Sequence, residues 1–179
     1  MRVGKFLEHF QAATKAVATI QDPVLKATAV GRQLGYALYL VFDLLQWVHG
    51  SKAYQFKPET AKFISRSAAR FWLYGLLFSL LSGVQKSLTI RRRLGAASRP
   101  RPTAEKEAER KVELQAILKE QHAVRRQILQ DSVDFILPST SLGYFNFNEG
   151  ILGAAGFITA IMGGRTQWRA VNGGGAAKK

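Results

Sequence analysis

Hydrophobic positions gather in two runs of the chain that contain no charged residue. The runs cover 71–85 and 150–164. As a helix, each run reaches about 22 Å, which is less than the roughly 30 Å hydrocarbon core of a bilayer. The first run can be lengthened, because a lysine such as Lys86 can snorkel toward the interface. The pattern predicts apolar helices over 58–90 and 150–167 that lie in, or against, hydrocarbon at borderline spanning length.

Residues 1–21 show a clear helical period. Apolar positions recur at three- and four-residue steps and cover an arc of about 140°. They are Val3, Phe6, Leu7, Phe10, Ala13, Val17 and Ile20. The other face carries Arg2, Lys5, Glu8, His9, Gln11, Lys15 and Thr19, of which Arg2 and His9 lie at the borders. The pattern is typical of an interfacial membrane helix, and also of a surface helix packed on the rest of the protein.

A further helix is predicted over 23–50, because Asp22 can cap its N-terminus and Pro23 fits its first position. The polar residues of this segment fall on one side. They are Arg32, Tyr36, Tyr39, Asp43 and Gln46. An acid in so apolar a helix indicates a function if the helix spans a membrane. We expect instead that the stripe faces water or a partner helix, and that the helix lies flat or packs.

The segment between the two apolar runs is strongly charged. Residues 91–103 are basic and proline-containing, which predicts a linker suited to phosphate head groups or simply to solvent. Residues 104–137 predict a charged helix that Pro138 stops, with a narrow apolar seam for a partner helix or short coiled coil. The seam consists of Leu114, Ile117, Leu118, Val124 and Ile128.

Small residues share one face of the second apolar run. They are Gly156, Ala160 and Gly164. In a membrane this spacing lets two helix backbones approach closely, whereas in an aqueous core it indicates only tight packing. We expect homo-oligomerisation through this face. The last segment, 168–179, is predicted to be a flexible tail.

Composition narrows the partners. The 179 residues include 26 Lys and Arg against 12 Asp and Glu, a net charge of +14. Such a surplus attracts polyanions, either nucleic acid or an anionic lipid surface, and the charge-free runs favour lipid. No segment resembles a cleavable signal or transit peptide, so targeting is expected to rely on internal signals.

No catalytic, metal or cofactor site is predicted. The chain has no cysteine, and its three histidines are scattered. It contains no nucleophile elbow, HExxH motif, phosphate-binding loop or dinucleotide fingerprint. The sequence therefore indicates a protein that is not an enzyme.

Taken in order, these segments resemble the peroxisomal biogenesis factor 11 family, the membrane-elongation peroxins, in a fungal form. The matching segments are RVGKFLEHFQAA at 2–13, RQLGYALYLVFDLLQW at 32–47, ARFWLYGLLFSLLSGVQK at 69–86, DSVDFILPSTSLGYF at 131–145 and GILGAAGFITAIMGGRTQW at 150–168. Their succession carries the match, since none is a sharp motif. Family members usually have a further N-terminal segment before the first of these, so Met1 is expected to mark a truncated gene model, a fragment or a short paralogue.

The resemblance implies a role in elongating and dividing peroxisomes. An amphipathic helix inserts in the cytosolic leaflet, the protein self-associates, and the peroxisomal division machinery is recruited. The lipid-binding residues it implies are Arg2, Val3, Lys5, Phe6, Leu7, Phe10, Lys15, Val17 and Ile20. The basic ones would meet the phosphates of anionic lipids, and the apolar ones would enter the acyl boundary.

The sequence thus predicts one all-α, membrane-associated domain over 1–179 that promotes peroxisome elongation, proliferation and fission at the peroxisomal membrane. A pore-forming or metabolite-transport protein is the alternative, with the stripe that includes Asp43 as its lining. A soluble nucleic-acid binder would leave the charge-free runs unexplained, so no nucleic acid is expected as a partner. Charge does not settle the topology, because both sides of the runs are basic.

Overall fold

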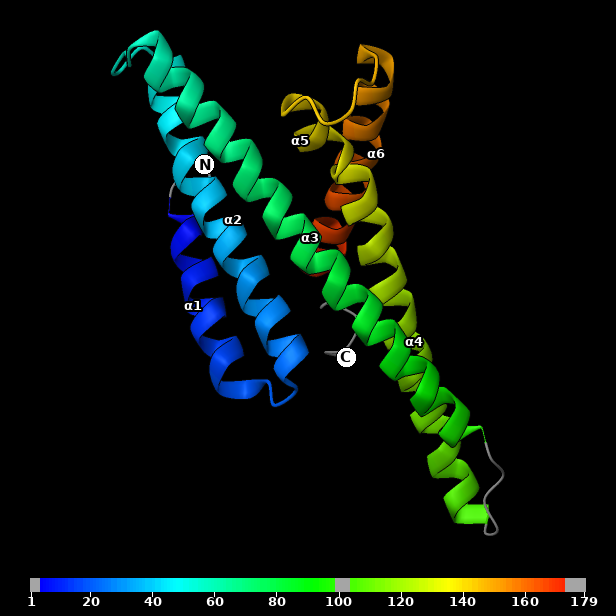
Figure 1. Cartoon of the computed structure of the whole chain (residues 1–179). Helices are drawn as coiled ribbons and strands as arrows, with labels where there is room; N and C mark the ends of the chain where they lie inside the picture. Colours follow the sequence, from blue (N-terminus) through cyan, green and yellow to red (C-terminus); the bar gives the residue numbers. More distant parts are fainter. Residues whose placement is uncertain (1–3, 99–103, 173–179) are drawn as a thin grey trace.

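The structure, a computed structural model, describes residues 4–98 and 104–172 (Figure 1). This part of the chain is all-α and contains six helices and no strand. They are α1 (Lys5–Thr19), α2 (Pro23–Gly50), α3 (Pro58–Ala97), α4 (Ala104–Asp134), α5 (Ile136–Ser141) and α6 (Glu149–Asn172).

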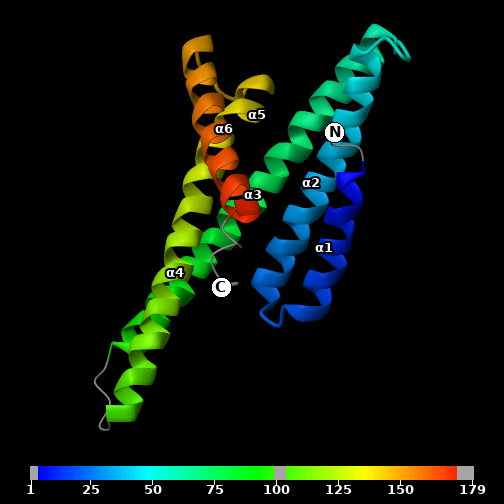
Figure 2. The same cartoon turned by 180° about the vertical axis from the view of Figure 1, so that it is seen from behind.

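The helices are arranged around α3, which has 40 residues. On one side α1, α2 and α3 pack side by side, with α2 between the other two and successive helices antiparallel. On the other side α4 turns back along the C-terminal half of α3, and α5 and α6 pack against α4 (Figure 2). We call the α1–α2–α3 arrangement the three-helix layer.

Glycine sets the spacing between α2 and α3. A Cβ atom at Gly35 would lie 2.7 Å from the backbone nitrogen of Gly75, so the two backbones touch at this point. Further along the same seam, Tyr39 stacks on Trp72 with ring centroids 5.4 Å apart. The layer is therefore held by a close backbone contact followed by interlocking aromatic rings.

The predicted seam of the charged helix has its partner within the chain. Ile117 of α4 is fully buried in a cluster with Ile90 and Ala97 of α3. Leu114 and Val124 pack against the same cluster. The expectation of a partner helix is confirmed for these residues, and that partner is α3, whereas Leu118 of the predicted seam is exposed.

Helix α2 begins as its sequence indicates. The carboxylate of Asp22 accepts hydrogen bonds from the backbone N–H groups of Val24 and Leu25, each over 2.9 Å. Pro23 occupies the first helical position, where its missing N–H costs nothing.

Three boundaries differ from expectation. Helix α3 continues to Ala97, so the basic linker predicted from residue 91 starts only after it. Pro138 does not end the charged helix, because α4 already ends at Asp134. Pro138 is instead the third residue of α5, in the first turn, where a backbone N–H has no partner within the helix. Helix α6 reaches Asn172, and the rest of the predicted tail, 173–179, lies outside the described residues, as do 99–103 of the linker.

Candidate membrane-binding surface

Helix α1 docks on α2 through its small side chains. Ala13 and Ala16 are 6% and 8% exposed. Next to them His9 donates from Nδ1 to Oε1 of Gln33 over 2.6 Å, and its ring lies 5.8 Å from that of Tyr36. The helix is thus tied to α2 by one edge of its apolar arc and a polar contact beside it.

The large apolar side chains of α1 remain exposed. Leu7, Phe10 and Val17 are 55%, 39% and 54% exposed. Phe6 and Ile20 lie at the edge of the contact and are half-buried. The apolar arc predicted from the sequence is therefore divided, with small residues on α2 and large ones free for another partner.

The basic residues of α1 lie on a different side. Lys5 and Lys15 are exposed. Lys15 borders a groove that runs over α2 to Lys86 of α3. Arg2 and Val3, which the sequence also assigned to the lipid-binding set, lie outside the described residues.

Helix α3 carries an exposed apolar stripe of its own. Its members recur at steps of three and four residues. They are Tyr74, Leu77, Leu81, Val84 and Leu88. Leu73 and Leu76, from the same charge-free run, are buried. The run is thus buried on one side and exposed on the other. Its lack of charge gives no sign of this division, whereas its helical period could have indicated it.

The two exposed sets lie on the same face of the three-helix layer. Phe10 and Lys15 are five positions apart. At 100° per residue this separation is about 500°, or one full turn plus 140°, so the two side chains point about 140° apart around α1. Leu81 likewise lies about 140° round α3 from Lys86. Because Lys15 and Lys86 border one groove, both apolar sets point to the opposite face.

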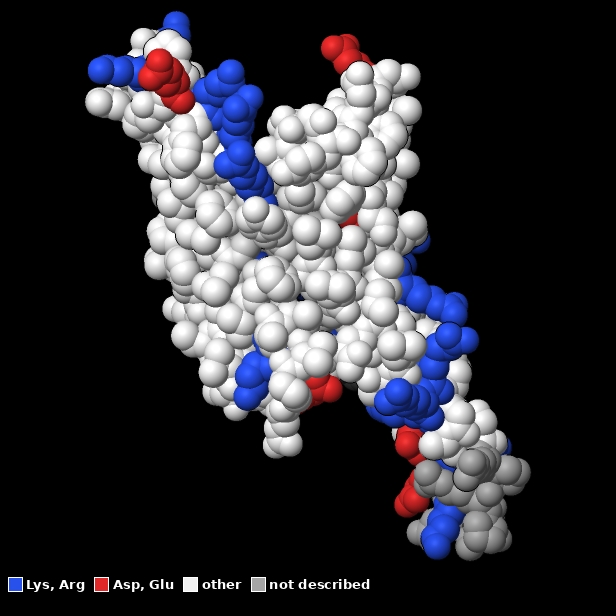
Figure 3. All heavy atoms as spheres, in the orientation of Figure 1, with Lys and Arg blue, Asp and Glu red and all other residues white. Residues whose placement is uncertain are grey.

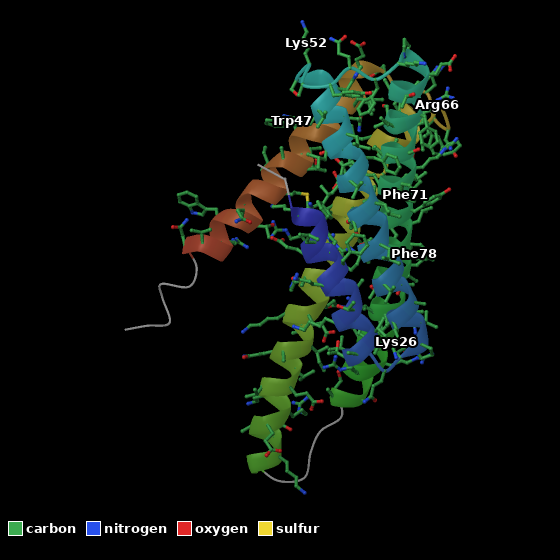
Figure 4. The ribbon with its side chains drawn as sticks, turned by 90° about the vertical axis from the view of Figure 1, so that its left-hand side faces the viewer. Lys26, Trp47, Lys52, Arg66, Phe71 and Phe78 are labelled. Carbon is green, nitrogen blue, oxygen red and sulfur yellow. The ribbon has the colours of Figure 1, made fainter. Side chains whose placement is uncertain are left out.

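This face is nearly free of charge in its middle. Figure 3 shows uncharged surface over α1–α3, with Lys and Arg side chains gathered toward the ends. Figure 4 labels Lys52 and Arg66 toward one end of the layer and Lys26 toward the other, with Phe71 and Phe78 of α3 between them. A band of this kind is typical of a surface that contacts lipid.

Only α3, among the described helices, is long and apolar enough to cross a membrane, and half of its most apolar stretch is buried inside the molecule. The second predicted run, in α6, does not meet this criterion of length and composition. The expectation of two borderline spans is therefore reduced to one.

The packing bears on whether α3 does cross. His9 of α1 contacts Gln33, and two residues further on Gly35 meets Gly75, near the N-terminal end of the charge-free run. A bilayer crossed by α3 would therefore surround α1 as well, including Glu8, which is exposed. Glu8 lies level with the end of the run, where a charge costs less than the roughly 2.5–3.5 kcal/mol at the centre of a spanning helix. A layer that lies along the membrane keeps this side chain in water.

A buried polar contact joins α3 and α4, and the sequence did not reveal it. Asp131 is 2% exposed and accepts a hydrogen bond from the hydroxyl of Ser79 over 2.5 Å. Its other carboxylate oxygen accepts from Nε2 of Gln127 over 2.7 Å. These bonds compensate for the burial of the acid and tie the two halves of the molecule together.

Burial also changes the protonation of two neighbouring groups. It raises the pKa of Asp134 above the ordinary value, an effect that a hydrogen bond from Thr159 opposes and the nearby Asp131 reinforces. Burial raises the pKa of Tyr36 to about 12, with Asp131 adding to the rise. Tyr36 therefore remains a neutral phenol at any physiological pH.

The small-residue face of α6 is open toward the rest of the described residues. It consists of Gly156, Ala160 and Gly164. Among the described residues, no heavy atom beyond the adjacent turns of α6 lies within 4 Å of the place that a Cβ would take at either glycine. The helix is held instead by Arg126 of α4, which donates to the carbonyl of Met162 and the hydroxyl of Thr166 over 2.8 and 2.6 Å.

Among the described residues, no group of three or more His, Asp and Glu side chains could hold a metal ion. The candidate binding features of the described residues are three surfaces. They are the uncharged face of the three-helix layer, the basic groove on its other side and the open small-residue face of α6.

Comparison with known proteins gives a consistent result. A family model described as peroxisomal biogenesis factor 11 matches residues 1–168. The peroxisomal membrane protein PMP27 of Saccharomyces cerevisiae is 26% identical over 174 residues, which cover 95% of this chain and 74% of that protein. The peroxisomal membrane protein PMP30B of Candida boidinii is 28% identical over 187 residues, covering 95% and 72%. No solved structure matches the chain.

Proposed function

The chain belongs to the peroxisomal biogenesis factor 11 family, whose members are peroxisomal membrane proteins known as peroxisome proliferation factors, and we propose that it acts by inserting one face of its three-helix layer into the cytosolic leaflet. The family is one of membrane biogenesis factors and not a known enzyme family. Promotion of peroxisome elongation and fission is its function at the peroxisomal membrane.

The division of the α1 apolar arc is the observation that carries the proposal. A helix that only packed on the protein would bury its largest apolar side chains, yet α1 buries alanines and exposes Leu7, Phe10 and Val17. These three side chains can enter the acyl boundary while α1 stays docked on α2. Lipid can therefore cover the exposed apolar side of α1 in place of another helix of the chain.

Insertion from one side expands one leaflet. Side chains that enter the headgroup and acyl boundary to about 5–10 Å push the lipids of that leaflet apart, and the other leaflet is unchanged. The exposed stripe of α3 widens the inserted area beyond that of a single helix. Many copies concentrated by self-association through α6 would bend the sheet toward a tubule, which the division machinery then cuts.

A pair of variants with equal charge tests the insertion. Phe10→Glu places an acid on the proposed lipid face, and Gln11→Glu places the same acid on an exposed position to the polar side. Losing a buried phenylalanine costs about 1.5–3 kcal/mol, so Phe10→Glu is expected to weaken binding to anionic vesicles about tenfold or more. Gln11→Glu is expected to weaken binding to anionic vesicles far less.

The readouts are vesicle flotation of the full chain and peroxisome length in cells. Phe10→Glu protein is expected to leave peroxisomes short while Gln11→Glu protein elongates them. Equal binding and equal elongation by the two variants would show that α1 has a structural role and that the insertion mechanism is wrong.

A further inference from the structure

The groove on the other face of the three-helix layer has the composition of an anion site. It has a volume of about 260 Å³, and helices α1, α2 and α3 all contribute to its wall. The polar side chains that line it are Lys15, Thr19, Arg32, Gln33, Ser82 and Lys86. Three of them are cationic and none is a carboxylate. We infer that this groove, which opens on the side of the layer away from the proposed lipid face, binds a soluble phosphomonoester.

The three cations have little to neutralise them within the described residues. Lys15 and Lys86 are exposed and form no ion pair in that part of the chain. Arg32 lies over the ring of Tyr36, with its guanidinium carbon 5.6 Å from the ring centroid. This contact holds the guanidinium in place without cancelling its charge. Like charges that converge from three helices repel one another, and an anion between them removes that repulsion.

Two neutral groups supply hydrogen-bond donors beside the cations. Ser82 is 7% exposed, lines the groove, and its hydroxyl makes no hydrogen bond to another described residue. Gln33 accepts from His9 through Oε1, which leaves its amide N–H groups as donors. The Ser82 hydroxyl oxygen is not sealed from solvent, so it is open to water or a ligand in the groove.

Charge and size identify the class of anion. A phosphomonoester carries about −1.5 to −2 charges and three acceptor oxygens at neutral pH, whereas the phosphodiester of an ordinary phospholipid carries one charge. Three cations and a free hydroxyl match the monoester better. The volume of about 260 Å³ is at the small end for ligand pockets, so it suits a phosphate with a short substituent.

Two probes separate a soluble ester from a lipid head group. Glycerol 3-phosphate reports a soluble ester, and calorimetric titration of the full chain in detergent measures its binding. Phosphatidic acid reports the lipid head group, and flotation compares vesicles containing it with phosphatidylserine vesicles of equal surface charge. Binding of glycerol 3-phosphate supports the inference. If glycerol 3-phosphate does not bind, the inference is overturned, and an advantage of phosphatidic acid over phosphatidylserine would then place the groove against the membrane.

Variants separate the groove from general attraction to a basic protein. Lys86→Gln removes one cation from the groove, and Lys62→Gln removes one exposed cation of the same helix outside it. Loss of a charged hydrogen bond is expected to weaken monoester binding about tenfold in Lys86→Gln protein and hardly at all in Lys62→Gln protein.

Ser82→Ala provides a second variant that leaves the charge unchanged. It is expected to weaken monoester binding several-fold and to leave binding to phosphatidylserine vesicles as in the unaltered protein. Circular dichroism confirms that each variant is folded. Monoester binding that is equal in Lys86→Gln, Lys62→Gln and Ser82→Ala protein would contradict the site.

Discussion

Gly35 and Gly75 bring the backbones of α2 and α3 into contact, and this contact reverses the usual effect of a glycine substitution. In most helices Gly→Ala adds up to about 1 kcal/mol of stability. At Gly35 the added Cβ would lie 2.7 Å from the Gly75 nitrogen, so the helices must separate. Gly35→Ala is expected to lower the free energy of unfolding in detergent by about 1–3 kcal/mol.

Gly95 of α3 is the matched control, because no neighbouring described residue has an atom within 4 Å of its Cβ position. Gly95→Ala is expected to raise the free energy of unfolding by up to about 1 kcal/mol. Chemical denaturation followed by circular dichroism measures both variants. A gain in stability for Gly35→Ala would mean that the two helices do not meet at this point.

Asp134 makes stability depend on pH in a direction that can be worked out. Its pKa is raised in the folded protein, so the folded state binds more protons than the unfolded state between the ordinary and the raised pKa. Stability therefore falls as pH rises through that window. Asp134→Asn is expected to be more stable than the unaltered protein at neutral pH, and the difference should vanish in acid. Denaturant unfolding at several pH values checks this, and lower stability of the Asn variant at neutral pH would contradict it.

At the scale of single elements, α6 combines a secured side with an open one. Arg126 secures it to α4, whereas the small-residue face has no neighbour at Gly156 and Gly164. We expect two copies of the chain to meet there. Replacing both glycines with leucine should keep the backbones apart and reduce cross-linked dimers, at a cost on the order of 1 kcal/mol per contact.

Ala154→Leu is the control for this experiment, since Ala154 is an exposed small residue of α6 outside that face. It should leave cross-linking in membranes unchanged. Dimers at the unaltered level in the double leucine variant would exclude the small-residue face from self-association.

At the scale of the whole molecule, the orientation of the three-helix layer decides which residues face water. The chain has no cysteine, so single cysteines can be introduced at Ser65 and Thr89, exposed positions on either side of the charge-free run. If the layer lies along the membrane, a membrane-impermeant maleimide added outside proteoliposomes labels both positions equally. Protection of one position but not the other would show that α3 crosses the bilayer.

Local patterns in the sequence are enough to predict most of the helices and their polarity. Local signals were sufficient, because a cap such as Asp22, a charge-free run and a three-to-four-residue period act within one helix. These signals predict both ends of α2 and the apolar arc of α1. They also predict that α4 packs on another helix through a seam that includes Ile117. The order of these segments also indicated the family.

Tertiary structure alone decided how those helices use their faces. Whether Phe10 or Ala13 meets α2 depends on a contact between segments, and the period of α1 is the same in both cases. The bond between Ser79 and Asp131 joins residues 52 positions apart, and the groove gathers Lys15, Arg32 and Lys86 from three helices. Such contacts arise only when helices pack, because packing fixes which residues far apart in the sequence become neighbours in space.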